Sequence, residues 1–126
     1  MTIFVFGNPD LPVDALPVRL VSKLKAKFPR HEFFVKDPNE EWDVPEKLMV
    51  IDTVKGINEV KQFNSLDSFT SAPRVSMHDF DALTQLRFLQ KLGKLKEVTI
   101  IGVPPEMDEQ KALECITPLL KKYKYN

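Results

Sequence analysis

The sequence predicts an α/β fold: a three-layer sandwich with helices on both faces of a mostly parallel, twisted sheet of about five strands, and an antiparallel strand at one edge. Two apolar runs, within residues 48–52 and 97–103, are the first observation, because short apolar runs bounded by Pro, Gly or charged residues are typical of strands buried on both faces. The second observation is that segments with apolar residues three or four positions apart alternate with the strand-like runs.

The first elements are a strand and a helix. Residues 2–6 are apolar and end at a cluster of turn formers, residues 7–9, which predicts a strand followed by a turn. The next helix is expected to begin near Asp14 and to end before Pro29. Its buried stripe consists of apolar residues spaced four apart, with one neighbour: Leu16, Leu20, Val21, Leu24 and Phe28.

A second strand and the central strand follow. Residues 32–36 predict a short strand, and the polar segment 37–46, which contains Trp42, is expected to cross the sheet edge without regular structure. Residues 48–52 then form the central strand, which ends in Asp52. In open α/β sheets, ligands bind beyond the carboxyl ends of the strands, so Asp52 is the first candidate for chemistry.

In the next part of the chain, an edge strand and a loop precede a helix. Residues 60–63 alternate like an edge strand, and Gly56 and Asn58 allow a tight antiparallel return. Residues 64–75 predict a loop. A helix opens around Ser76, where Asp79 three residues later resembles a capping box, and ends at Gly93. Its expected buried positions are Phe80, Leu83, Leu86, Leu89 and Leu92.

The last elements are a strand over residues 97–103 and a helix from about Asp108 to Tyr123. The buried side of this helix is expected to carry Leu113, Ile116, Leu120 and Tyr123, and Pro118 predicts a kink or a restart.

Length and composition bound the class of protein. The 126 residues predict one domain over residues 1–126. The 18 basic and 18 acidic side chains balance, so we expect neither nucleic acid nor a membrane as partner. The apolar N-terminus lacks a basic start and is broken at residues 8–10, unlike a secretion signal. Cys115 is the one cysteine, predicted to pack in the last helix, so no internal disulfide forms. A cytoplasmic location is the simplest expectation.

Three residues are the main candidates for a site, because right-handed crossovers bring loops after parallel strands to one sheet edge. Asp14 opens the first helix, where an aspartate is commonly only an N-cap, although Pro17 at the third helical position has no N–H to donate. His78 begins a later helix, where the helix dipole favours the neutral, metal-binding imidazole, but a lone histidine is more often a packing residue. Asp52 ends a buried strand and therefore needs a hydrogen bond, an ion pair or a metal.

Two carboxylates and an imidazole would form an oxygen-rich site with open coordination positions. Their spacing alone is not a motif. His31 is predicted to be an exposed turn residue, and no phosphate loop or nucleophilic serine elbow is present in the sequence.

At these residues the chain resembles the nickel-iron hydrogenase maturation endopeptidases. Five fragments carry the resemblance, in the family's order along nearly the whole chain: residues 7–9, 14–21, 50–54, 76–79 and 101–106. The resemblance implies a five-stranded α/β domain whose acidic residue at the first helix, aspartate at the central strand and histidine at a later helix bind a nickel-type ion. In this chain these are Asp14, Asp52 and His78.

The resemblance also implies an activity, which is removal of the C-terminal extension of a hydrogenase large-subunit precursor after nickel insertion. Nickel would be supplied by that precursor, and zinc or cadmium are expected to substitute in vitro. Asp37 matches the aspartate of an Asp-Gly-Gly-Thr type segment after the second strand and joins Asp14, Asp52 and His78 as a catalytic candidate. The chain departs from the family in having Asp14 in place of glutamate, and Pro38, Asn39 and Glu40 in place of the glycine-rich residues.

Two alternatives stay open. The first is a non-catalytic relative, a nickel-site sensor or assembly factor that docks on a maturing metalloenzyme. The second is an α/β domain whose acidic residues only cap helices and pair with cations.

Overall fold

A five-stranded sheet is the centre of the fold in the computed structural model, which describes residues 1–71 and 82–123. The strands are β1 (Thr2–Val5), β2 (Glu32–Val35), β3 (Lys47–Thr53), β4 (Lys61–Phe63) and β5 (Glu97–Val103). They lie in the order β2-β1-β3-β5-β4, and all neighbouring pairs are parallel except β4 with β5. The predicted mostly parallel sheet with one antiparallel edge strand is confirmed.

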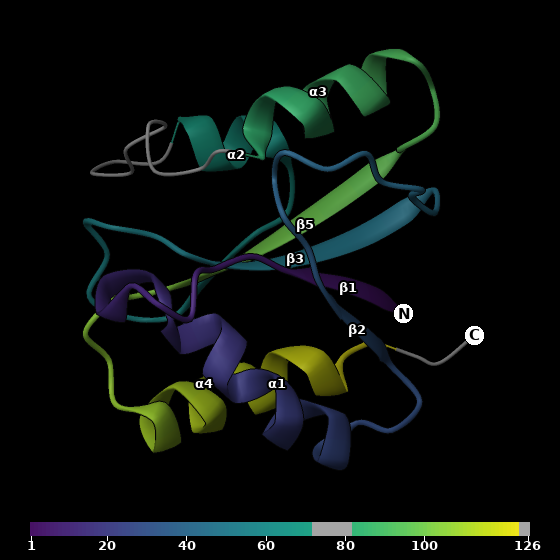
Figure 1. The fold of residues 1–126 in the computed structure, drawn as a ribbon. Coiled ribbons are helices and arrows are strands. Elements are labelled where there is room, and N and C mark those ends of the chain that lie inside the picture. The colour runs from purple at the N-terminus through teal and green to yellow at the C-terminus, as the bar shows by residue number, and fades with distance from the viewer. Residues whose placement is uncertain (72–81, 124–126) are drawn as a thin grey trace.

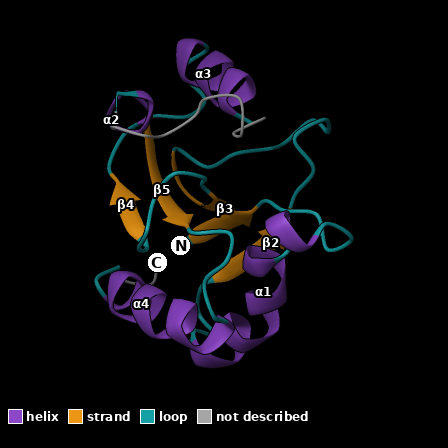
Figure 2. Cartoon of the chain, turned by 90° about the vertical axis from the view of Figure 1, so that its left-hand side faces the viewer, coloured by secondary structure: helices purple, strands orange, loops and turns teal. Residues whose placement is uncertain are grey.

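Helices cover both faces of the sheet. The helical elements are the 3₁₀ turn η1 (Pro12–Asp14) and the helices α1 (Leu16–Lys27), α2 (Leu66–Thr70), α3 (Leu83–Lys91) and α4 (Glu109–Lys121). In Figure 1, α1 and α4 lie below the sheet and α2 and α3 lie above it, and the turned view in Figure 2 shows the same three layers. The predicted three-layer sandwich is therefore confirmed.

Alternation along β3 and β5 divides the apolar core in two. Met49, Ile51 and Ile101 pack in the cluster that includes α1 and α4, whereas Val50 and Ile100 pack in the cluster that includes α2 and α3. Successive strand residues point to opposite faces, so both faces of these central strands are apolar and covered. The predicted stripe of the first helix is also confirmed, because Leu16, Leu20, Val21, Leu24 and Phe28 are all buried.

Three element predictions need correction. Residues 64–75 are not all loop, because the short helix α2 begins after Ser65, whose side chain accepts a hydrogen bond from the Ser68 N–H. β4 does not form a hairpin with β3 but pairs with β5, which arrives later in the chain. Leu92 is 52% exposed, because repeated steps of three residues rotate around a helix of 3.6 residues per turn and carry position 92 away from the buried side.

Other predicted features agree with the structure or fall outside the described residues. Gly93, with φ of 75°, ends α3 as expected, and α4 continues through Pro118 without a restart. The capping-box residues Ser76 and Asp79, and Phe80, lie outside the described residues. Within the part of the chain that is described, no helix combines the length and apolar character needed to span a bilayer.

The prediction that His31 is exposed is wrong. Only 5% of the residue is accessible; its ring packs against Phe28, and its Nδ1 lies 3.2 Å from the amino group of Met1. Loss of hydration on burial, with the nearby N-terminal ammonium as a second cause, lowers the pKa of His31 below 6.5, and a hydrogen bond with the backbone of Leu120 opposes this shift.

We expect His31 to make the fold less stable in mild acid. The unfolded chain takes up a proton near pH 6.5, the ordinary pKa, whereas the folded chain resists protonation because its pKa is lower. The stability that the folded chain has with neutral His31 is therefore fully present above pH 6.5. It is lost as the pH falls from 6.5 towards the lower pKa of the folded state. Urea unfolding at pH 7.5 and 5.5 would show a larger loss for the wild type than for His31→Gln. An equal loss in both proteins would contradict the assignment.

Candidate functional site

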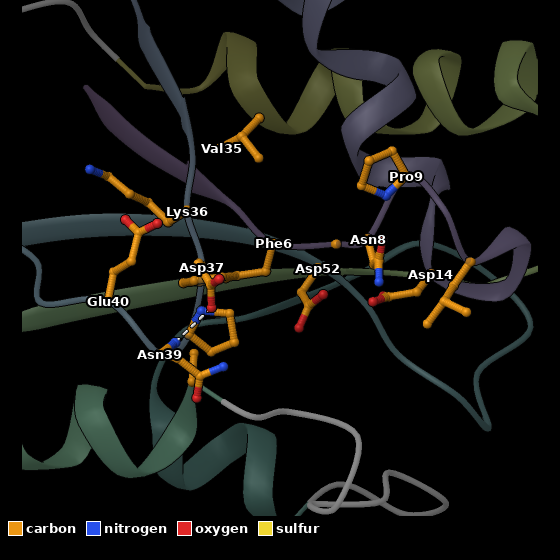
Figure 3. A pocket seen from close by; sticks show the side chains of 14 residues that line it. Phe6, Asn8, Pro9, Asp14, Val35, Lys36, Asp37, Asn39, Glu40 and Asp52 are labelled. Atoms are coloured by element: carbon orange, nitrogen blue, oxygen red, sulfur yellow. Dashed lines mark hydrogen bonds between the residues drawn. The ribbon is translucent and has the colours of Figure 1, made fainter.

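A cavity with a volume of about 560 Å³ lies at the carboxyl ends of β1, β2 and β3. In the sheet, β2 lies on one side of β1 and β3 lies on the other side. The order of the strands therefore reverses direction at β1, next to the cavity. Ligands of open α/β sheets bind at such points. Figure 3 shows the side chains that line the cavity.

Asp14, Asp37 and Asp52 all line this cavity, although they come from separate parts of the chain: Asp14 and Asp37 follow β1 and β2, and Asp52 lies near the end of β3. In Figure 3, Asp52 is drawn between Asp37 on one side and Asn8 and Asp14 on the other. The predicted convergence of these three residues at one sheet edge is therefore observed. His78 lies outside the described residues, so its position relative to the three carboxylates stays a prediction.

Asp52 is held rigidly at the end of the central strand. The residue is 6% exposed, and its Oδ1 accepts a hydrogen bond from the Thr53 N–H at 2.8 Å. In β5, Gly102 is the register partner of Asp52. A Cβ at Gly102 would lie 2.8 Å from Cγ2 of Val54, so the absence of a side chain there permits the packing next to Asp52.

Asp14 is not the N-cap of α1. Ala15 occupies the cap position, and Asp14 instead ends the 3₁₀ turn η1, where its residue is half-buried. The Asp14 carbonyl accepts a hydrogen bond from the Asn8 N–H at 3.0 Å, and a Cβ at Gly7 would lie 2.6 Å from that carbonyl oxygen. The turn after β1 and the segment that carries Asp14 thus fix one another.

Asp37 lies at the exposed rim of the cavity and is positioned by Trp42. The Trp42 ring packs against Phe4 and Phe6 in the core, and its Nε1–H donates to the Asp37 carbonyl at 2.9 Å. Segment 37–46 therefore crosses a face of the sheet, and not only its edge as predicted. The Asp37 Oδ1 accepts a hydrogen bond from the Asn39 N–H at 2.8 Å, drawn as a dashed line in Figure 3. This bond closes a local turn at the place where Pro38, Asn39 and Glu40 replace the glycine-rich residues of the family that the sequence resembles.

Carboxylates dominate the charge of the cavity. Among its described lining residues, Asp14, Asp37, Glu40 and Asp52 are acidic and Lys36 is the one basic residue. The Lys36 Nζ lies 5.3 Å from the centroid of the Phe4 ring and 5.5 Å from that of Phe34. Such a cavity favours a cationic ligand or a metal ion over an anion.

The donor set fits a metal ion only in part. Carboxylate oxygens can bind a divalent ion, and Asp14 and Asp52 supply them to one cavity. In the described ranges 1–71 and 82–123, however, no three His, Cys, Asp or Glu side chains lie close enough together to hold a metal ion. A complete site therefore requires a further ligand, either from residues 72–81 or from a bound partner.

Several lining residues were not predicted from the sequence. Asn8, Lys36 and Glu40 contribute polar groups, and the exposed Leu11 and Val35 contribute apolar surface. Asn8 carries a signal that could have been used, since it directly follows the first strand, as a residue at a strand's carboxyl end. Glu40 carries none, because its place depends on how Trp42 anchors the loop.

The fold resembles three solved structures. The NiFe hydrogenase maturation protease HybD from Thermococcus kodakarensis superposes with a TM-score of 0.68 at 19% identity, covering 98% of this chain and 99% of that one. The hydrogenase maturating endopeptidase HybD from Escherichia coli gives 0.63 at 20% identity, covering 97% and 89%. An endopeptidase from Escherichia coli, solved in solution, gives 0.57 at 21% identity with coverages of 97% and 89%.

No family profile matches the sequence, and a search of curated proteins finds no match. The likeness is therefore carried by structure, over nearly the full length of each chain. The chain has the fold of the hydrogenase maturation proteases, as the resemblance of its motifs implied.

Proposed function

We propose that this protein is an endopeptidase that removes the C-terminal extension of a nickel-containing hydrogenase large subunit after nickel has been inserted. The observation that supports this proposal is one acidic cavity, lined by Asp14, Asp37 and Asp52, at the carboxyl ends of three adjacent strands. It occurs in a fold shared with proteins whose names state this type of activity. The substrate would be the large-subunit precursor.

In this proposal nickel belongs to the substrate. A divalent ion beside a peptide bond can polarise the carbonyl or activate a water molecule. Asp52 and Asp14 are proposed to hold the ion, because both offer carboxylate oxygens to the same cavity, and His78 is proposed as the third ligand. Ligands of this kind leave the free protein with an incomplete site, which the nickel-loaded precursor would complete.

Asp37 is proposed to act on the peptide and not on the metal. It lies at the exposed rim, where the loop fixed by Trp42 faces the entrance of the cavity. A carboxylate at that place can hold or move a proton during hydrolysis. Its Oδ1 accepts the Asn39 N–H, which fixes the orientation of the carboxylate.

Incubation of the purified protein with nickel-loaded and nickel-free precursor tests the proposal directly. We expect mass spectrometry to detect a released C-terminal peptide only with the loaded precursor. Isothermal titration with Ni²⁺, Zn²⁺ and Cd²⁺ should show weak binding that is lost when Asp14, Asp52 or His78 is replaced by alanine. Cleavage that is unchanged in all three variants would contradict the proposed site.

One observation favours a second candidate function, a non-catalytic sensor or assembly factor for the nickel site. The loop after β2 has Pro38 and Asn39 in place of glycines, and the Asp37–Asn39 bond holds it closed. Glycines allow close approach of a peptide backbone, so this loop offers less room for a bound peptide. A stable complex with loaded precursor that yields no released peptide would identify this second function.

A further inference from the structure

The outer edge of β2 has main-chain hydrogen-bonding groups that pair with no strand in the described part of the chain. The N–H groups of Glu32 and Lys36 donate to the carbonyls of Met1 and Val5 in β1, at 2.9 and 3.0 Å. Hydrogen bonding alternates along a parallel strand, so the N–H and C=O groups of Phe33 and Val35 point away from β1. β2 is the last strand on this side of the sheet, and no described strand pairs with its outer edge.

The side chains of this edge are apolar and accessible. Phe34 is 40% exposed and Val35, on the opposite face of the strand, is 50% exposed. The other edge strand, β4, is only three residues long and carries the exposed Lys61. Charged side chains, above all lysine, are a common protection against unwanted strand pairing, and in β2 the three residues after Glu32 carry none. Its outer edge is therefore suited to accept an extended chain with apolar side chains.

The free edge runs directly into the acidic cavity. Val35 belongs to β2 and also lines the cavity, and the next two residues, Lys36 and Asp37, line it as well. Figure 3 shows Val35, Lys36 and Asp37 in sequence along the chain towards Asp52. A segment paired with the edge would therefore end next to residues that line the cavity.

We infer that the precursor segment around the scissile bond binds as an added strand along the outer edge of β2. This inference rests on the proposed protease function and deepens it by naming how the substrate is held. Main-chain hydrogen bonds to Phe33 and Val35 supply affinity that depends little on sequence, and contacts with Phe34 and Val35 select apolar side chains. The strand then places the scissile bond beside Asp37 and Asp52.

Val35→Pro tests the inference, because proline removes the outward N–H and leaves the N–H groups that bind β1 untouched. Loss of one hydrogen bond should raise KM for loaded precursor about tenfold while kcat changes by less than about twofold. Val35→Ala keeps the N–H and should raise KM by at most about threefold. Phe88→Ala, at a 58% exposed site on α3, is the control that should behave as the wild type.

A second measurement does not depend on the folding of Val35→Pro. Amide hydrogen exchange of the wild type should slow at Phe33 and Val35 when precursor is added, and should stay unchanged at Phe88. Unaltered exchange at both strand residues, or equal KM values for Val35→Pro and Val35→Ala, would overturn the inference. So would an edge occupied by a second copy of this chain, seen as exchange that slows with protein concentration alone.

The outcomes also separate the inference from the proposed function. If the wild type cleaves the precursor and Val35→Pro does so with unchanged KM, strand addition is wrong and the protease function stands. If the wild type releases no peptide, the protease function itself is wrong.

Discussion

Asp52→Asn is expected to lower cleavage of nickel-loaded precursor by about 10²- to 10³-fold, the effect of removing one electrostatic group from a catalytic site. Asparagine has nearly the shape of aspartate and keeps an oxygen that can accept the Thr53 N–H. The fold should therefore survive, with the free energy of unfolding changed by no more than about 1 kcal/mol. The loss of activity would come from the lost charge and from the replacement of one carboxylate oxygen by an amide nitrogen.

Parallel measurement of kcat/KM, Cd²⁺ affinity and urea unfolding checks this expectation. If Asp52 serves only the fold, Asp52→Asn would lose stability while retaining cleavage and metal binding. Ala82 also lines the cavity but carries no polar side chain, so Ala82→Ser offers a control for small changes in the cavity wall. It should retain most of the activity.

The elements predicted well are those defined by local pattern. Residues 97–103 form β5 with the predicted bounds, and the stripe from Leu16 to Phe28 is buried as its spacing indicates. In both segments the apolar residues whose spacing indicates a strand or a helix are also the residues that pack in the core, so the local pattern is sufficient. α2 was missed because a five-residue helix has only Leu66 and Phe69 to mark a buried side, which is too short for a period.

Features that depend on distant segments could not be predicted. His31 is buried because the N-terminal residue, Phe28 after α1 and the end of α4 meet around it, and both the N-terminus and α4 are far from it in the sequence. The partner of β4 is β5, which lies more than thirty residues later in the chain. A pattern within one segment contains no information about either contact.

The position of the candidate site could be predicted from the sequence to the extent that it depends only on the topology of the sheet. Asp52 follows a strand that the sequence identifies, and Asp37 follows another, so their meeting follows from a parallel sheet. The local structure around each candidate aspartate could not be predicted from the sequence. An N-cap role was one of two alternatives left open for Asp14, but Pro12 begins a 3₁₀ turn that places the cap at Ala15.

Substitutions at Asp14 are expected to have the second large effect on activity. Asp14→Ala is expected to lower kcat/KM for loaded precursor about 10²-fold, because it removes a proposed metal-binding carboxylate. Asp14→Glu should retain activity within about tenfold of the wild type, since it keeps the charge and extends the side chain by one methylene, roughly 1.5 Å. The cavity, at about 560 Å³, has room for this extension.

The contrast between the two variants is informative because the backbone of Asp14 is fixed. Its N–H donates to the Leu11 carbonyl at 2.9 Å, and its carbonyl accepts the Asn8 N–H beside Gly7. Neither of these two bonds involves the side chain, so both variants keep them, and urea unfolding of each variant shows whether the fold is intact. Measured kcat/KM values would then report the carboxylate alone. If Asp14→Glu were as inactive as Asp14→Ala, the length of the side chain and not its charge would govern the site. If Asp14→Ala stayed fully active, Asp14 would not contact the metal, and Asp52 would need a different partner in the cavity.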